Sequence, residues 1–198
     1  MSKTMKRLVS LCMAFAMTMT CFITSANAAA LKEIKDVDLS TIIEYQYVLP
    51  SGGEVVGTIE DAIIDDSSPT YSLNALKSGS LFSMTAKSVG DNYLLVTGPS
   101  KSFYSRQLTL GGLRIIGNLH EDTGKHISVK VGACRYDSDS GLFIAYPDTY
   151  EYVTTGGSVR IEIPKSNFSK EYSYRGFIKH FDIDAHVSGN LSFYNANV

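Results

Sequence analysis

The stretch at residues 127–131, ISVKV, alternates apolar and polar side chains without a break. Its apolar residues share one parity, whereas Ser128 and Lys130 share the other. Successive side chains of a β-strand point to opposite faces of the sheet, so this pattern predicts a strand with one buried and one solvated face. Residues 159–163, VRIEI, repeat the pattern and predict a second strand of the same kind.

Similar short segments follow one another along the chain, separated by turns that contain Gly, Ser, Asp or Pro. We expect strands at residues 41–49, 54–64, 81–86, 92–97, 103–110, 113–119, 127–136, 150–154, 158–163 and 172–179, and a last one that ends near residue 194. Only residues 31–38 show helical spacing, and only for one turn. About ten strands with short connections predict an all-β fold, a single antiparallel β-sandwich, with a β-barrel as the alternative.

The N-terminal segment has the three parts of a secretory signal. Lys3, Lys6 and Arg7 precede an apolar run over residues 8–24, and small residues follow at 25–30 (SANAAA). We therefore expect residues 1–28 to be a cleaved signal peptide and residues 29–198 to form a single secreted β-sandwich domain. The product would be extracellular or attached to the cell envelope, with no transmembrane anchor after cleavage.

Charge and cysteine content narrow the classes of partner. The chain has 18 basic and 20 acidic residues, and three of the basic ones lie in the predicted signal peptide, which leaves a net charge of −5. No basic cluster occurs, so nucleic acid is excluded as a partner. Only Cys134 remains after cleavage, and one cysteine cannot form a disulfide within the chain. We interpret Cys134 as a small core residue.

Two segments place a pair of histidines around acidic residues, HEDTGKH at 120–126 and HFDIDAH at 180–186. If each segment is the end of a hairpin, the two histidines face each other and could bind a transition metal such as zinc. The candidate ligands are His120, His126, His180, His186, Asp182 and Asp184. If 180–186 is instead a strand, its histidines lie about 20 Å apart and the two aspartates are a candidate acid–base pair. The alternative is a set of solvated polar turns.

Residues 136–141, YDSDSG, partly resemble a calcium-binding loop. Asp137 and Asp139 would supply oxygen ligands, and Gly141 would allow the tight turn. The glycine comes one place early, and Asp148 stands where the loop has a glutamate. An ordinary hairpin turn is the alternative interpretation.

Tyrosine is the better indication of function, because it offers stacking surface and a hydroxyl group. The chain has 12 tyrosines and no tryptophan. Pairs at spacing i, i+2 share one face of a strand, and the candidate binding residues are Tyr150, Tyr152, Tyr172 and Tyr174. A third pair, Tyr45 and Tyr47, shares its face with apolar residues and is expected in the core.

The sequence therefore favours a non-enzymatic, secreted β-sandwich protein that binds a protein or a glycan. One alternative is a secreted hydrolase or metal-dependent enzyme that uses the histidine and aspartate clusters. Another is a structural subunit that assembles through exposed strand edges. The binding hypothesis requires no cofactor, and calcium or zinc enters only with the metal sites named above.

Overall fold

The computed structural model describes residues 48–49, 51–66, 79–89, 93–182 and 184–198. They belong to one compact unit, Gln46–Val198. The predicted signal peptide, the helical turn at 31–38 and nearly all of the strand expected at 41–49, including Tyr45 and Tyr47, lie outside these ranges. No helix within them combines the length and the apolar character needed to cross a bilayer.

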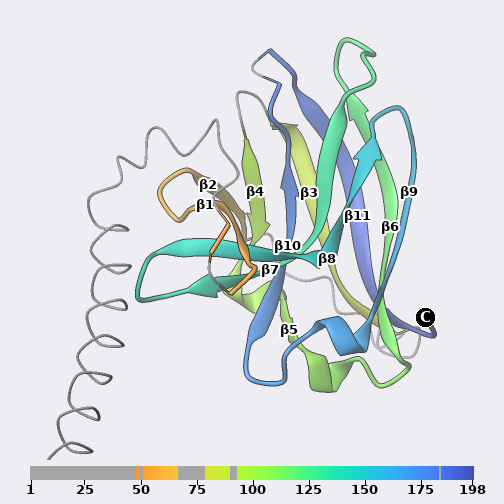
Figure 1. The fold of residues 1–198 in the computed structure, drawn as a ribbon. Helices are drawn as coiled ribbons and strands as arrows, with labels where there is room; N and C mark the ends of the chain where they lie inside the picture. The colour runs from red at the N-terminus through yellow and green to blue at the C-terminus, as the bar shows by residue number, and fades with distance from the viewer. Residues whose placement is uncertain (1–47, 50, 67–78, 90–92, 183) are drawn as a thin grey trace, which may run out of the picture. The chain divides into compact units, whose positions relative to one another are not determined.

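The described residues form an all-β sandwich of two sheets, as the alternation predicts (Figure 1). The seven-stranded sheet has the order β1 (Glu54–Thr58), β8 (Leu142–Thr154), β7 (Ser128–Asp137), β10 (Ser173–Lys179), β4 (Leu94–Thr97) and β2 (Ala62–Asp65), and β5 (Ser102–Tyr104) also pairs with β10. The four-stranded sheet has the order β3 (Ser80–Val89), β11 (Val187–Ala196), β6 (Gly112–Glu121) and β9 (Gly157–Pro164). The 3-10 turns are η2 (Pro99–Lys101), η3 (Ser105–Gln107) and η4 (Lys165–Asn167). The paired strands are antiparallel except β2 and β4, which are parallel.

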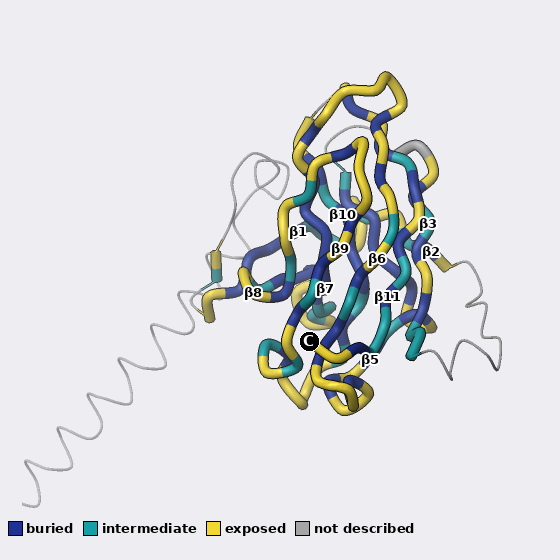
Figure 2. The backbone as a smooth tube through the Cα atoms, turned by 90° about the vertical axis from the view of Figure 1, so that its right-hand side faces the viewer, coloured by how far each residue is buried: buried dark blue, intermediate teal, exposed yellow. Residues whose placement is uncertain are grey.

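The main core lies between the two sheets. Val129 and Val131 of β7 face β9 residues such as Ile161 across it, and all three are buried. Phe82 and Phe193 stack at its centre with ring centroids 4.6 Å apart. Figure 2 shows the buried residues concentrated along the strands and the exposed ones in the loops at the two ends.

The seven-stranded sheet is curled. Residues 59–61 alone join β1 to β2, yet these strands lie at opposite edges of the sheet. Four residue steps reach at most about 14 Å, whereas five strand spacings in a flat sheet would separate the edges by about 24 Å. The edges must therefore approach each other, and a side chain placed at Gly57 of β1 would come within 2.6 Å of Leu94 of β4.

A second core fills the inside of the curl. It comprises Val56, Leu94, Val96, Cys134, Phe143, Ala145 and Phe177. Cys134 and Phe177 project from the face of β7 and β10 opposite to the main core, where the alternation predicts a solvated surface. Ser128 is exposed, as expected of this face of ISVKV, but the expectation is wrong for Lys130, which the curl buries to 0% exposure.

Several strand boundaries also differ from those expected. The strand expected at 54–64 is divided by the turn at 59–61, and the one at 103–110 is only β5 followed by η3. The segment at 150–154 is the end of the longer β8, which bends where the β7–β8 register skips between Gly132 and Cys134. Gly176 does not bulge β10, since it pairs regularly with Ala133.

A substitution at Gly176 can test how tightly the main core is packed. A Cβ atom there would lie 2.5 Å from the ring of Phe193, which is buried against Phe82 and has no room to shift. We expect Gly176→Ala to lower the free energy of unfolding by about 1–3 kcal/mol through overpacking. Gly157→Ala is the matched control, because nothing lies within 4 Å of its Cβ position. Urea unfolding measures both, and equal stability of the two variants would contradict the packing described.

Candidate functional site

Aromatic and basic side chains gather at one mouth of the curl. We call this group the aromatic–lysine patch; it consists of Glu54, Lys130, Tyr150, Tyr152, Lys179 and Phe181. Strand register brings its members together, because Tyr152 of β8, Lys130 of β7 and Lys179 of β10 are direct neighbours across three strands. Glu54 reaches the patch from β1, on the facing wall of the curl.

A buried ion pair anchors the patch. Lys130 Nζ donates to Glu54 Oε1, and both side chains are nearly inaccessible to solvent. The hydroxyl of Tyr150 donates to Glu54 Oε2 at 2.8 Å. The ammonium group also lies 4.8 Å from the ring centroid of Tyr150, 5.3 Å from that of Tyr152 and 5.6 Å from that of Phe181. Contacts of this kind offset the cost of removing both charges from water.

Gly132 explains why the two tyrosines differ in exposure. It pairs with Tyr150, and a Cβ atom at Gly132 would lie 2.4 Å from that of Tyr150. Without one, the ring of Tyr150 packs against Phe177 at a centroid distance of 6.2 Å. Burial and the hydrogen bond to Glu54 raise the pKa of Tyr150, so it remains a hydrogen-bond donor. Tyr152 lies farther toward the mouth and is 54% exposed.

Lys179 is the second cation of the patch and is only partly buried. Its Nζ donates to the carbonyl oxygen of Val56 at 2.6 Å, and no carboxylate within the described ranges forms a salt bridge with it. Burial, and then the nearby charge of Lys130, lower its pKa to about 8, against the opposing influence of Glu54 and Asp61. Lysines with lowered pKa values are frequent at functional sites.

The patch therefore presents two exposed rings, and one of them lies beside a cation that has no ionic partner within the described ranges. Phe181 is 40% exposed, and its ring centroid lies 4.9 Å from Lys179 Nζ. Rings of this kind provide flat apolar surface for stacking, and the ammonium provides directed donors. The arrangement suits recognition of a ligand at the surface.

Of the two predicted tyrosine pairs, Tyr150 and Tyr152 are in contact, whereas Tyr172 and Tyr174 lie in different environments. Tyr150 and Tyr152 contact edge to face at 6.0 Å. Tyr172 lies elsewhere, 39% exposed, with the guanidinium of Arg135 stacked 4.2 Å from its ring. Tyr174 is only 2% exposed and stacks on Phe103 in the main core. The prediction that Tyr174 belongs to a binding surface is therefore corrected, because its ring is needed for packing.

Both histidine segments connect one sheet to the other instead of closing a hairpin. Residues 120–126 run from β6 in the four-stranded sheet to β7 in the seven-stranded sheet, and 180–186 run from β10 back to β11. The hairpin alternative, with His120 opposite His126 and His180 opposite His186, is therefore wrong. His180 is buried, whereas His120, His126, Asp182, Asp184 and His186 are exposed.

No three His, Cys, Asp or Glu side chains in the described ranges lie close enough together to hold a metal ion. The YDSDSG segment forms the turn from β7 to β8, in which the hydroxyl of Ser140 donates to Asp137 and Gly141 has a positive φ of 70°. Asp139 is exposed in this turn. The pKa of the Cys134 thiol is raised to about 12 by burial, which removes its nucleophilic character.

Glu121 joins the two sheet-crossing segments. Its Oε2 accepts hydrogen bonds from the hydroxyl and the N–H of Thr123, at 2.6 and 2.9 Å, and from the N–H of Lys125 at 3.0 Å. Its Oε1 accepts from the N–H of His186 at 3.5 Å. The hydroxyl of Thr123 contributes most to lowering the pKa of Glu121 to about 2.

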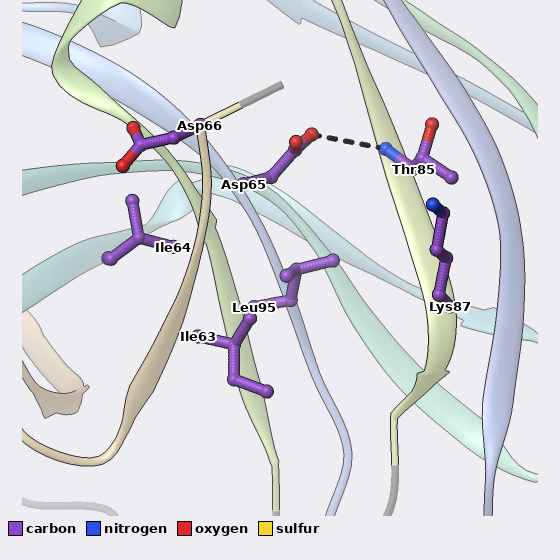
Figure 3. Close-up of a pocket in the computed structure, with 7 residues that line it drawn as sticks. All are labelled: Ile63, Ile64, Asp65, Asp66, Thr85, Lys87 and Leu95. Carbon is purple, nitrogen blue, oxygen red and sulfur yellow. Dashed lines mark hydrogen bonds between the residues drawn. The ribbon is translucent and has the colours of Figure 1, made fainter.

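A groove lies between β2 and β3, the edge strands of the two sheets (Figure 3). Its volume is about 340 Å³, and its lining comprises Ile63, Ile64, Asp65, Asp66, Thr85, Lys87 and Leu95. Asp65 Oδ2 accepts from the N–H of Thr85 at 3.2 Å and from Lys101 Nζ at 3.0 Å, so it ties the sheets together. Because these polar contacts are structural, the groove is a weaker candidate than the aromatic–lysine patch.

Comparison with known proteins gives no family. No family model matches the chain, and no curated protein matches it. Among solved structures, the Yersinia pseudotuberculosis-derived mitogen matches at 10% identity with a TM-score of 0.27, over 57% of this chain and 81% of that one. A likeness this distant carries no argument about function.

The buried ion pair can be tested by removing one partner and then both. Lys130→Met leaves the Glu54 carboxylate buried without its cation, and we expect a loss of about 3–5 kcal/mol in the free energy of unfolding. Adding Glu54→Leu should recover most of that loss, because no uncompensated charge remains. Arg160→Met breaks the exposed pair with Glu162 and should cost at most about 1 kcal/mol. A double variant no more stable than Lys130→Met would contradict this account.

Glu121→Gln tests the link between the crossing segments. The folded state holds the pKa of Glu121 near 2, below the ordinary 4.5, so its stabilising effect is complete above pH 4.5 and disappears as the pH falls toward 2. The variant should be less stable than the wild type at pH 7, and the gap should close over that acidic range. Urea unfolding at several pH values measures this. Glu171→Gln, at an exposed turn, is the control, and a gap independent of pH would refute the prediction.

Proposed function

We propose that this chain is an exported, non-enzymatic binding protein that recognises an extracellular or cell-envelope ligand, a glycan or a protein, through the aromatic–lysine patch. The observation that carries the proposal is the exposure of Tyr152 and Phe181, with Phe181 beside Lys179 and Tyr152 beside Lys130. Exposed aromatic rings at the rim of a rigid scaffold resemble the anchors that dominate binding energies. Export is supported by the N-terminal sequence pattern.

Contacts among its own members hold the patch together. The ammonium group of Lys130 contacts both exposed rings, and Glu54 pairs with Lys130. Side chains that are already held by such contacts lose less conformational entropy when a ligand binds. Of the two ligand classes, the patch favours a glycan, because exposed rings with the ammonium of Lys179 beside one of them match the apolar face and the hydroxyls of a sugar.

The enzyme alternative has less support from the described residues. Asp182, Asp184 and the histidines are spread over the end of β6 and two connecting segments, and no three of them lie close enough together to hold a metal ion. Cys134 is inaccessible. A binding role therefore accounts for more of the observed geometry than a hydrolytic one.

Expression of the full chain with its own N-terminus tests export and binding together. We expect a cleaved product in the culture medium that binds members of a glycan array or an immobilised cell-envelope polysaccharide. Tyr152→Ala and Phe181→Ala should each weaken binding by about tenfold or more, since truncated anchors cost at least about 1.4 kcal/mol. Tyr172→Ala removes a ring of similar exposure elsewhere and should leave affinity unchanged. Equal effects of all three variants, or retention of the chain in the cell, would contradict the proposal.

A further inference from the structure

The charged groups around Lys179 favour one class of glycan as the ligand. The charged groups that face Lys179 are Lys130 from β7, Glu54 from β1 and Asp61 from the turn between β1 and β2. Glu54 is already engaged by Lys130 and by the hydroxyl of Tyr150. Asp61 accepts a hydrogen bond from the hydroxyl of Thr58 at 2.6 Å. Among the residues that the structure describes, Lys179 therefore donates to the carbonyl oxygen of Val56 and to no carboxylate.

The position of Lys179 decides where an anion would sit. Its Nζ lies 4.9 Å from the ring centroid of Phe181. On the neighbouring strand, Lys130 is within 5.6 Å of that ring and within 5.3 Å of the ring of Tyr152. A ligand stacked on the ring of Phe181 would thus bring its substituents to the ammonium of Lys179. The buried, already paired Lys130 could not serve in its place.

We infer that the aromatic–lysine patch recognises a carboxylate-bearing sugar, of the hexuronate or sialate class, with the sugar ring on Phe181 and the carboxylate on Lys179. This inference rests on the proposed function and specifies its ligand. A carboxylate supplies the ionic partner that Lys179 lacks, and a charge-assisted hydrogen bond in a partly buried site is about twice as strong as a neutral one. The overall negative charge of the exported chain favours a ligand with one local carboxylate over a long polyanion.

The experiment compares acidic sugars with their methyl esters, which keep the ring and remove the charge. The exported chain is titrated calorimetrically with uronate- and sialate-bearing oligosaccharides, with the same compounds as methyl esters, and with an acidic peptide. We expect at least one acid to bind about tenfold or more tightly than its ester. In Lys179→Met, acid and ester should bind equally weakly.

The pH dependence supplies an independent readout. Because the pKa of Lys179 is near 8, affinity for the acid should be full below that pH and fall above it, while ester binding stays constant. Lys179→Arg keeps its charge at every accessible pH and should bind the acid more tightly than the ester at a pH well above 8, where the wild type binds the two equally. A merely structural role for Lys179 would not produce this rescue.

The outcomes separate the inference from the proposed function. If the esters bind as well as the acids, or if only neutral glycans bind with dependence on Tyr152, the inference is overturned and the proposed function stands. Binding of the acidic peptide alone overturns the inference in favour of a protein partner. If no sugar or peptide binds and the aromatic variants change nothing, both fail.

Discussion

A three-residue connection between opposite edges of one sheet is the constraint on which the rest of this structure depends. Because residues 59–61 are too short to cross a flat sheet, the seven-stranded sheet must curl, and a curl has an inside that must be filled. Val56, Cys134 and Phe177 fill its middle. The main sandwich core lies on the other side of the same strands, so β7 and β10 are covered on both faces.

The polar end of the curl follows from the same constraint. β1 closes the curl by facing β7 and β10, and its tethers there are the Lys130–Glu54 ion pair and the bond from Lys179 to the carbonyl of Val56. A buried ion pair contributes little net stability compared with an apolar pair, but breaking it is costly. We therefore regard it as a device that fixes the position of β1. The aromatic rings that shield Lys130 then become the exposed rings of the proposed binding surface.

The fold class could be predicted from the sequence alone, whereas most of the candidate site could not. Period-two alternation at residues 127–131 and 159–163 correctly predicts strands and their apolar face, because that pattern depends only on local geometry. It cannot show what lies over the other face. Lys130 was therefore placed in solvent, although the small, uncharged Gly132 and Cys134 of the same parity indicated burial. The turn within 54–64 was missed because residues 59–61, Ile-Glu-Asp, contain no glycine or proline to mark it. Phe181 was missed because its exposure depends on the path between the sheets, although a lone phenylalanine among aspartates gave a signal.

The buried sulfur of Cys134 has a further consequence. It sits inside the curl, inaccessible and protonated, and it is the single thiol expected in the exported chain. A thiol-specific reagent can reach it only when β1 and β2 separate from the rest of the sheet. Its labelling rate therefore reports the frequency of that local opening, which need not equal the frequency of global unfolding. Labelling of Cys134 thus measures how often the curled edge of the sheet, formed by β1 and β2, opens.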